Sequence, residues 1–81
     1  MTEEETRAKV LDLLADVAGD PEVREHLDED LFELGILDSM AAIELLVGLE
    51  DELGVSIAPT EVERSEMNTV NKIVAQVVKR L

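Results

Sequence analysis

Residues 37–54, LDSMAAIELLVGLEDELG, carry the strongest structural signal in the chain. Aliphatic residues recur in this stretch at spacings of three and four, which is typical of an amphipathic helix. Asp38 and Ser39 stand before the repeat and are residue types that commonly begin a helix, whereas Gly54 after it is the type that commonly ends one. We therefore predict a helix from Asp38-Ser39 to about Leu53, with an apolar stripe made of Ile43, Leu45, Leu46, Leu49 and Leu53.

Two further long helices are predicted, one on each side of this helix. A capping box at Thr2 and Glu5 and a stop signal at Gly19 place the first over residues 3–18. Thr69 is expected to cap the last helix. Its helical spacing predicts a buried face made of Val70, Ile73, Val74, Val77, Val78 and Leu81.

The connections between these helices carry weaker signals. Residues 19–38 lack a clear period, and we expect an ordered loop across the core, with a short helical turn near residues 21–27. Residues 60–63 repeat the capping-box pattern and should open a short third helix. The predicted fold is all-α: a bundle of three main helices plus one short helix, with a long first loop, in a single domain over residues 1–81. The apolar residues expected to anchor that loop are Val23, Leu27, Leu31, Phe32, Leu34, Ile36 and Leu37.

The composition excludes several classes of function. Twenty acidic and seven basic residues give a net charge of −13, which disfavours binding to nucleic acid or to an anionic membrane surface. A basic protein surface is the natural complement, because long-range attraction speeds encounter. The chain has no cysteine and a single histidine, so a Cys–His pair or a thiolate metal site cannot be assembled. We interpret His26 as a plain surface residue.

The sequence predicts neither a signal peptide nor a membrane-spanning segment. The N-terminal MTEEETRAK is charged from its third residue, unlike a signal peptide, and no apolar run approaches about 18 residues. We expect a monomeric cytoplasmic protein with no membrane insertion.

Residues 28–39 do not match the pattern of a calcium-binding loop, because Glu33 stands where glycine belongs and Ser39 where a bidentate glutamate belongs. No metal site is predicted.

Ser39 has two interpretations from its position alone. A serine that opens a helix after a long loop is exposed, and the unpaired N–H groups there favour a covalently held phosphate. Asp38 or Ser39 could instead be an ordinary cap, the commoner role for these residue types at a helix start. Position alone leaves both interpretations open.

The segment LFELGILDSM, residues 31–40, resembles the attachment motif of acyl- and peptidyl-carrier proteins, and helix order and loop lengths extend the resemblance over the whole chain. The resemblance implies that a phosphopantetheinyl transferase attaches 4′-phosphopantetheine from coenzyme A to Ser39. Asp38 beside it would help the transferase position metal and coenzyme. The carrier itself would have no catalytic residue. The surface implied for enzyme partners consists of Met40, Glu44, Val47, Glu50 and Asp51.

Within that class the chain is most similar to D-alanyl carrier proteins, through residues 31–40, 63–66 and 68–74. It departs from their usual pattern at residues 41–43, which are Ala-Ala-Ile instead of Gly-Thr-Val, at Glu63-Arg64 instead of Asp-Arg, and at Met67, which stands at a tryptophan position. The resemblance implies that a ligase adenylates D-alanine and loads it on the arm as a thioester. The carrier would then deliver it to a membrane-bound acyltransferase system that esterifies teichoic acids.

Three alternatives remain open at the level of sequence. One is a carrier for fatty-acyl, peptidyl or polyketide intermediates. Another, of a different class, is an unmodified acidic helical adaptor in which Ser39 only caps the helix. A hydrolase is the weakest alternative, because no pairing of a base with a nucleophile can be named.

Overall fold

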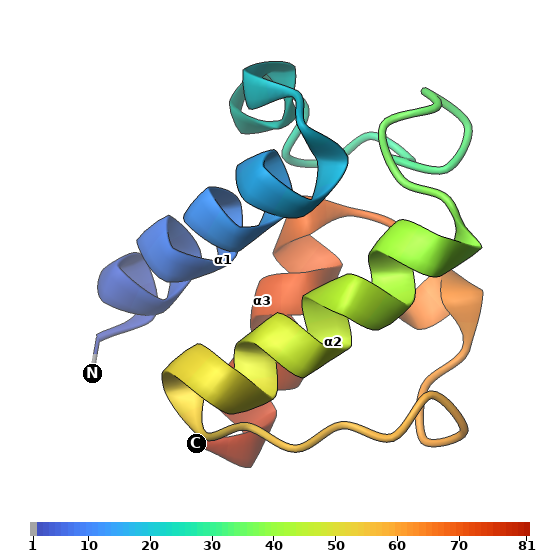
Figure 1. Cartoon of the computed structure of the whole chain (residues 1–81). Coiled ribbons are helices and arrows are strands. Elements are labelled where there is room, and N and C mark those ends of the chain that lie inside the picture. Colours follow the sequence, from blue (N-terminus) through green and yellow to red (C-terminus); the bar gives the residue numbers. More distant parts are fainter. Residues whose placement is uncertain (1) are drawn as a thin grey trace.

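The computed structural model describes residues 2–81, and its three α-helices follow the predicted ranges closely. The described residues form no strand. The predicted all-α bundle of three main helices is confirmed (Figure 1). Within residues 2–81 the fold consists of three α-helices and two short 3-10 helices, in the order α1 (Glu3–Ala18), η1 (Pro21–Glu25), α2 (Ser39–Leu53), η2 (Arg64–Glu66) and α3 (Val70–Arg80).

Local hydrogen bonds set the ends of the helices. The hydroxyl of Thr2 accepts the Glu5 N–H at 3.1 Å, and the Glu5 carboxylate accepts the Thr2 N–H at 3.4 Å, so the capping box that opens α1 is confirmed. Gly54 ends α2 with a φ of +67°, a left-handed conformation that glycine adopts without strain. The Thr69 hydroxyl accepts the Lys72 N–H at 3.1 Å and caps α3 as predicted.

The predicted start of the short third helix is wrong. Residues 59–61 form a turn, which the Glu61 N–H closes on the Ala58 carbonyl at 2.9 Å. The capping box that opens η2 lies three residues later, where the Glu63 N–H donates to the Glu66 carboxylate at 3.0 Å. The acidic residues of this segment satisfy the pattern in more than one register, so the pattern alone does not choose between them.

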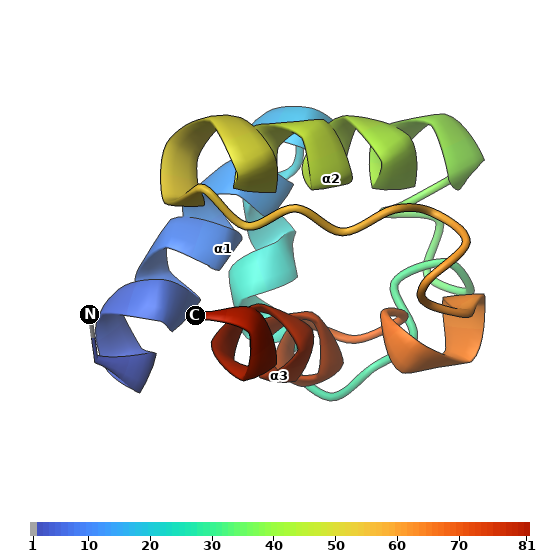
Figure 2. The same cartoon turned by 90° about the horizontal axis from the view of Figure 1, so that it is seen from below.

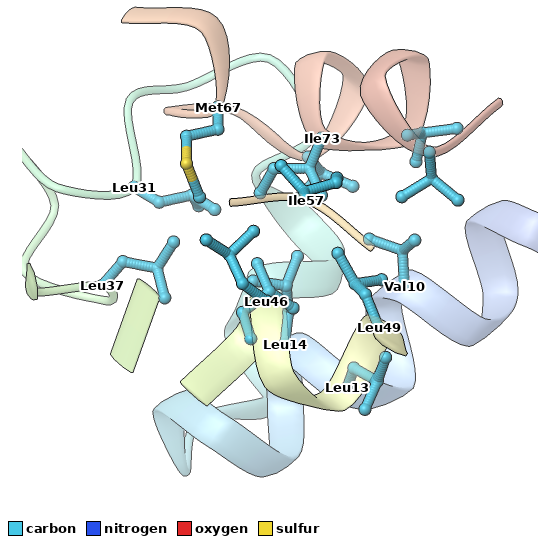
Figure 3. Packing of buried hydrophobic residues seen from close by; sticks show 14 of the residues in the cluster. Val10, Leu13, Leu14, Leu31, Leu37, Leu46, Leu49, Ile57, Met67 and Ile73 are labelled. Carbon is cyan, nitrogen blue, oxygen red and sulfur yellow. The ribbon is translucent and has the colours of Figure 1, made fainter. Parts of the chain in front are cut away.

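Helix α1 packs against both α2 and α3, while side chains from the connection after α2 fill the space between α2 and α3. Figure 2 shows α2 above and α3 below, with that connection running between them. In Figure 3, Leu46 and Leu49 of α2 face Ile73 of α3 across Ile57. Gly48 permits the close approach of α1 and α2, because a Cβ atom there would lie 3.0 Å from the Leu13 side chain.

The inner face of α2 is narrower than predicted. Leu45, Leu46 and Leu49 are buried as expected, but Ile43 is 53% exposed, so its assignment to the buried stripe is wrong. An α-helix turns about 100° per residue, which places Ile43 about 200° from Leu45, on the opposite side of the helix. Burial of Leu45 therefore forces Ile43 outward.

The predicted buried face of α3 is also too long. Val70, Ile73, Val74 and Val77 are buried, but Val78 is 42% exposed and Leu81 is 56% exposed. Val78 lies about 100° around the helix from Val77, and Leu81 follows the last helical residue. The buried face therefore ends at Val77.

The long first connection is ordered, as predicted, and crosses the core. Val23, Leu31 and Leu37 are buried, whereas Leu34, which was expected to be an anchor, is 43% exposed. Leu34 belongs to a turn in which its N–H donates to the Asp30 carbonyl at 3.1 Å, and this turn directs its side chain away from the core.

Candidate functional site

Ser39 is the first residue of α2, and its side chain is exposed. The preceding residue, Asp38, is the N-cap, and its carboxylate accepts the Ala41 N–H at 2.8 Å. Within residues 2–81 the Ser39 hydroxyl makes no hydrogen bond. Capping therefore explains Asp38 and leaves the Ser39 hydroxyl without a structural role.

An anchored loop presents this serine. Leu37, two residues before it, is buried, and the N–H groups of Ile36 and Leu37 donate to the Leu31 carbonyl at 2.9 and 3.1 Å. Leu31 is fully buried, and its own N–H donates to the Asn68 carbonyl at 2.7 Å. Contacts distant in sequence therefore hold the start of α2 in place, as rigid presentation of a reactive group requires.

Asp30 ties the same loop to the segment before α3. Its carboxylate accepts the N–H groups of Phe32 and Glu33 at 2.9 and 3.2 Å and the Asn68 amide at 3.0 Å. Partial burial opposes ionisation, but these hydrogen bonds and the nearby charge of Arg64 together lower the pKa of Asp30. The ionised carboxylate therefore links the entrances of α2 and α3.

An open, largely apolar hollow of about 210 Å³ lies beside Ser39. Arg64 stands at this hollow, with its guanidinium carbon 4.1 Å from the centroid of the Phe32 ring, a cation–π contact. The residues that line the hollow come from α2, the first loop and the segment before α3: Phe32, Ser39, Ala42, Ile43, Leu46, Pro59, Val62, Arg64 and Met67.

The core, by contrast, is nearly full. The space between Leu46, Ile57, Met67 and Ile73 amounts to about 10 Å³. A cavity of that size holds at most one water molecule. The free volume near Ser39 therefore lies outside the bundle and not between its helices.

The outer face of α2 carries an exposed apolar stripe. Met40 is 74% exposed, Ile43 53% and Val47 54%, and their spacing of three and four places them on one side of the helix. The exposed acidic residues Glu44, Glu50 and Asp51 fall with them within an arc of about 120°.

All five predicted partner-surface residues thus lie on one exposed face of α2, and Ile43 joins them. Ile43 was assigned to the core because periodicity gives only relative angles. Its position opposite the more central Leu45 was the signal that could have placed it outside.

The single histidine belongs neither to the outer face of α2 nor to the lining of the hollow beside Ser39. His26 Nδ1 is 2.8 Å from the Glu29 carboxylate, and this hydrogen bond raises the pKa of His26, aided by the charge of Glu29 and opposed by burial. In the part of the chain that the structure describes, no three His, Asp or Glu side chains are placed to hold a metal ion. None of the helices there is both long and apolar enough to cross a membrane.

Comparison with known proteins identifies the family. The sequence pattern of the phosphopantetheine attachment site family matches residues 8–77. The D-alanyl carrier protein of Lactococcus lactis subsp. lactis is 47% identical over 74 residues, which cover 91% of this chain and 94% of the relative. The D-alanyl carrier protein of Lacticaseibacillus rhamnosus is 44% identical over 77 residues, which cover 95% of each. The chain belongs to the D-alanyl carrier protein family.

D-alanyl carrier proteins are carriers and not enzymes, and their prosthetic group is 4′-phosphopantetheine, so the predictions of a carrier, of this cofactor and of no enzymatic activity are confirmed. The region around Ser39 suits such a group. It offers an exposed hydroxyl at a fixed helix start, an apolar hollow beside it and one cation for a phosphate. The unmodified adaptor is thereby set aside.

Proposed function

We propose that Ser39 carries the 4′-phosphopantetheine arm and that residues 1–81 act as a single carrier domain. The observation that supports this most is the Ser39 hydroxyl, which is exposed at the first position of α2 and makes no hydrogen bond within the described residues. Asp38, and not Ser39, caps the start of α2. When bound, the arm supplies the thiol that holds the cargo as a thioester.

The direct test is modification in vitro. The purified chain is incubated with coenzyme A and a broad-specificity phosphopantetheinyl transferase, and its intact mass is measured. We expect one phosphopantetheine per chain in the wild type and none in Ser39→Ala. The matched control is Ser56→Ala, which alters another exposed serine and should leave modification unchanged. Modification that persists in Ser39→Ala would show that the site is elsewhere.

We propose D-alanine as the cargo. Relatives named D-alanyl carrier protein are 44–47% identical to the chain over nearly its whole length. The core supports the same cargo, because an interior space of about 10 Å³ cannot shelter a long acyl chain, whereas an aminoacyl group this small needs no chamber. A carrier for fatty-acyl, peptidyl or polyketide intermediates is the alternative that this observation disfavours.

Selection of D-alanine over similar amino acids would fall to the ligase. A methyl-sized difference is worth only about 1–3 kcal/mol in an apolar pocket. No pocket around Ser39 is enclosed enough to apply even that. We therefore propose that this chain contributes by docking to the D-alanine ligase and then to a membrane-bound acyltransferase system for teichoic acids, from the cytoplasmic side.

The outer face of α2 is the proposed docking surface for these enzymes. Its exposed Met40 and Val47 supply apolar contact, and Glu44, Glu50 and Asp51 attract a basic partner. Asp38 lies beside Ser39 and is proposed to contact the transferase that modifies it. Both docking to these enzymes and contact with the transferase use side chains that are already exposed in this fold.

A loading assay tests cargo and surface together. Holo protein is offered to D-alanine ligase and, in parallel, to a fatty-acyl carrier synthetase, and we expect thioester formation with D-alanine only. Charge reversal of Glu44 and Glu50 to lysine should slow D-alanine loading about tenfold at low salt. Reversal of Glu4 and Asp16 on α1 makes the same change in net charge and should have a much smaller effect. Fatty acylation without D-alanylation would overturn the cargo and leave Ser39 standing.

A further inference from the structure

Arg64 forms no close ion pair in the described part of this strongly acidic chain, although its charge acts on the Asp30 carboxylate. Three of the seven basic residues form ion pairs, Arg7 with Glu3, Arg24 with Asp12 and Arg80 with Glu61. Arg64 is exposed, and no carboxylate of the described residues lies within 4.0 Å of it. Its guanidinium lies over the face of the Phe32 ring.

That contact places a cation at the hollow beside Ser39. Arg64 and Ser39 line the same hollow, and both views of the fold show η2 and the start of α2 at the same end of the molecule (Figures 1 and 2). A guanidinium held over an aromatic face keeps its N–H groups available for an oxyanion, and its planar fork matches phosphate geometry.

The rest of the hollow is apolar and of limited size. Ala42, Ile43, Leu46 and Met67 contribute apolar walls, and the volume is about 210 Å³. Pockets that enclose a drug-sized ligand measure about 300–1,000 Å³, so this hollow suits a fragment of a long ligand. Next to its phosphodiester, phosphopantetheine carries a carbon with two methyl groups, a compact apolar fragment of that kind.

We propose that Arg64 is a positioning residue for the prosthetic arm. Its guanidinium pairs with the phosphodiester on Ser39 and holds the adjoining dimethyl segment in the hollow against Ile43 and Met67. The thiol end of the arm remains outside, accessible to enzymes. This inference rests on the proposed attachment at Ser39 and adds a docked position for the arm on the carrier's own surface.

The test uses holo protein with ¹³C in the two arm methyl groups and in the methionine methyl groups. We expect nuclear Overhauser contacts between the arm methyls and the Met67 methyl, and a ³¹P resonance displaced from that of the same phosphodiester in urea-unfolded holo protein. Arg64→Gln should lose the contacts and return the ³¹P resonance toward its position in the unfolded protein. The control Arg24→Gln removes the same charge at a distant ion pair and should leave both signals unchanged.

The intact mass distinguishes a failure of attachment at Ser39 from a failure of the proposed role of Arg64. If Ser39 is not modified, the proposed function fails. If Ser39 is modified but the wild type shows no arm contacts, or Arg64→Gln retains them at full strength, only the role of Arg64 is overturned. The apo spectrum of each variant reports its fold. Should Arg64→Gln prove misfolded, Arg64→Lys keeps the charge without the planar fork: weakened contacts support the proposal, and unchanged contacts overturn it.

Discussion

Helices α2 and α3 bury similar apolar faces, but their outer faces differ. In α3 the aliphatic residues gather on the inner side, and Val78 is the one large aliphatic side chain of the helix that is exposed. In α2 the inner Leu45 and Leu49 are matched on the outside by Ile43 and two further exposed apolar residues. The core does not require this second apolar face, which is why we propose it as a docking surface.

The charges of the two helices differ in the same sense. Helix α2 contains no basic residue, and its outer face carries Glu44, Glu50 and Asp51. Helix α3 ends in Lys79 and Arg80, which suit the negative end of its dipole. The comparison separates a helix whose composition serves folding from one that we propose serves docking as well.

The largest effect, on the free energy of unfolding, is expected for the buried inner faces that α2 and α3 share. Leu45→Ala in α2 and Ile73→Ala in α3 each remove a buried side chain and should lower the free energy of unfolding by about 2–5 kcal/mol. Urea unfolding monitored by circular dichroism measures this. Ile43→Ala, the exposed control, should change it by less than about 0.5 kcal/mol. A cost for Ile43→Ala equal to that for Leu45→Ala would contradict the assignment of the two faces.

Substitutions on the outer face of α2 should weaken ligase binding, whereas a substitution on the outer face of α3 should not. Met40→Ser, Ile43→Ser and Val47→Ser should each weaken ligase binding by about 1–2 kcal/mol, since buried apolar anchors dominate interfaces. Val78→Ser on α3, 42% exposed against 54% for Val47, should leave binding unchanged. Loading rates at subsaturating ligase provide the measurement. Equal losses on both helices would remove the distinction between them.

The caps of the two helices should behave alike. Asp38→Ala and Thr69→Ala each remove a side-chain acceptor from a backbone N–H and should cost about 1 kcal/mol in unfolding free energy. Ser39→Ala should cost less than about 0.5 kcal/mol, because its hydroxyl caps nothing. Thermal unfolding of the apo forms compares the three. A cost for Ser39→Ala as large as that for Asp38→Ala would return Ser39 to the role of a cap.

The smallest effect concerns the link between the two helix entrances. The pKa of Asp30 is lowered in the folded state by hydrogen bonds from Glu33, Phe32 and Asn68 and by the charge of Arg64, which together outweigh its partial burial. Its ionised form therefore contributes stability above its ordinary pKa, and that contribution is lost as pH falls through the lowered pKa of the folded state. Asp30→Asn, which cannot ionise, should lack this contribution.

Melting temperatures of wild type and Asp30→Asn between pH 2 and 6 measure the effect. The wild type should be the more stable at pH 6, and the gap should narrow as the pH falls below about 4. A gap that stays constant with pH would show that the charge of Asp30 contributes nothing to the link.

Features governed by near neighbours could be predicted from the sequence. Caps join residues three apart, so Thr2 with Glu5 and Thr69 with Lys72 were readable as patterns. The start of α2 was readable for the same reason, and with it the position of Ser39 at an exposed helix end. The predicted acidic and apolar partner residues also lie on one face of α2, because spacing along a helix determines relative angles.

Features that depend on distant segments could not be predicted in this way. Spacing gives angles within a helix but not which face the rest of the chain covers, so Ile43 was placed inside and lies outside. The hollow beside Ser39 requires Phe32 of the first loop to meet Val62 and Arg64 of the segment before α3, and the link from Asp30 to Asn68 spans 38 positions. Local patterns specified the helices and the position of Ser39, while packing between distant segments decided what surrounds that serine, because only in the folded chain do those segments become neighbours.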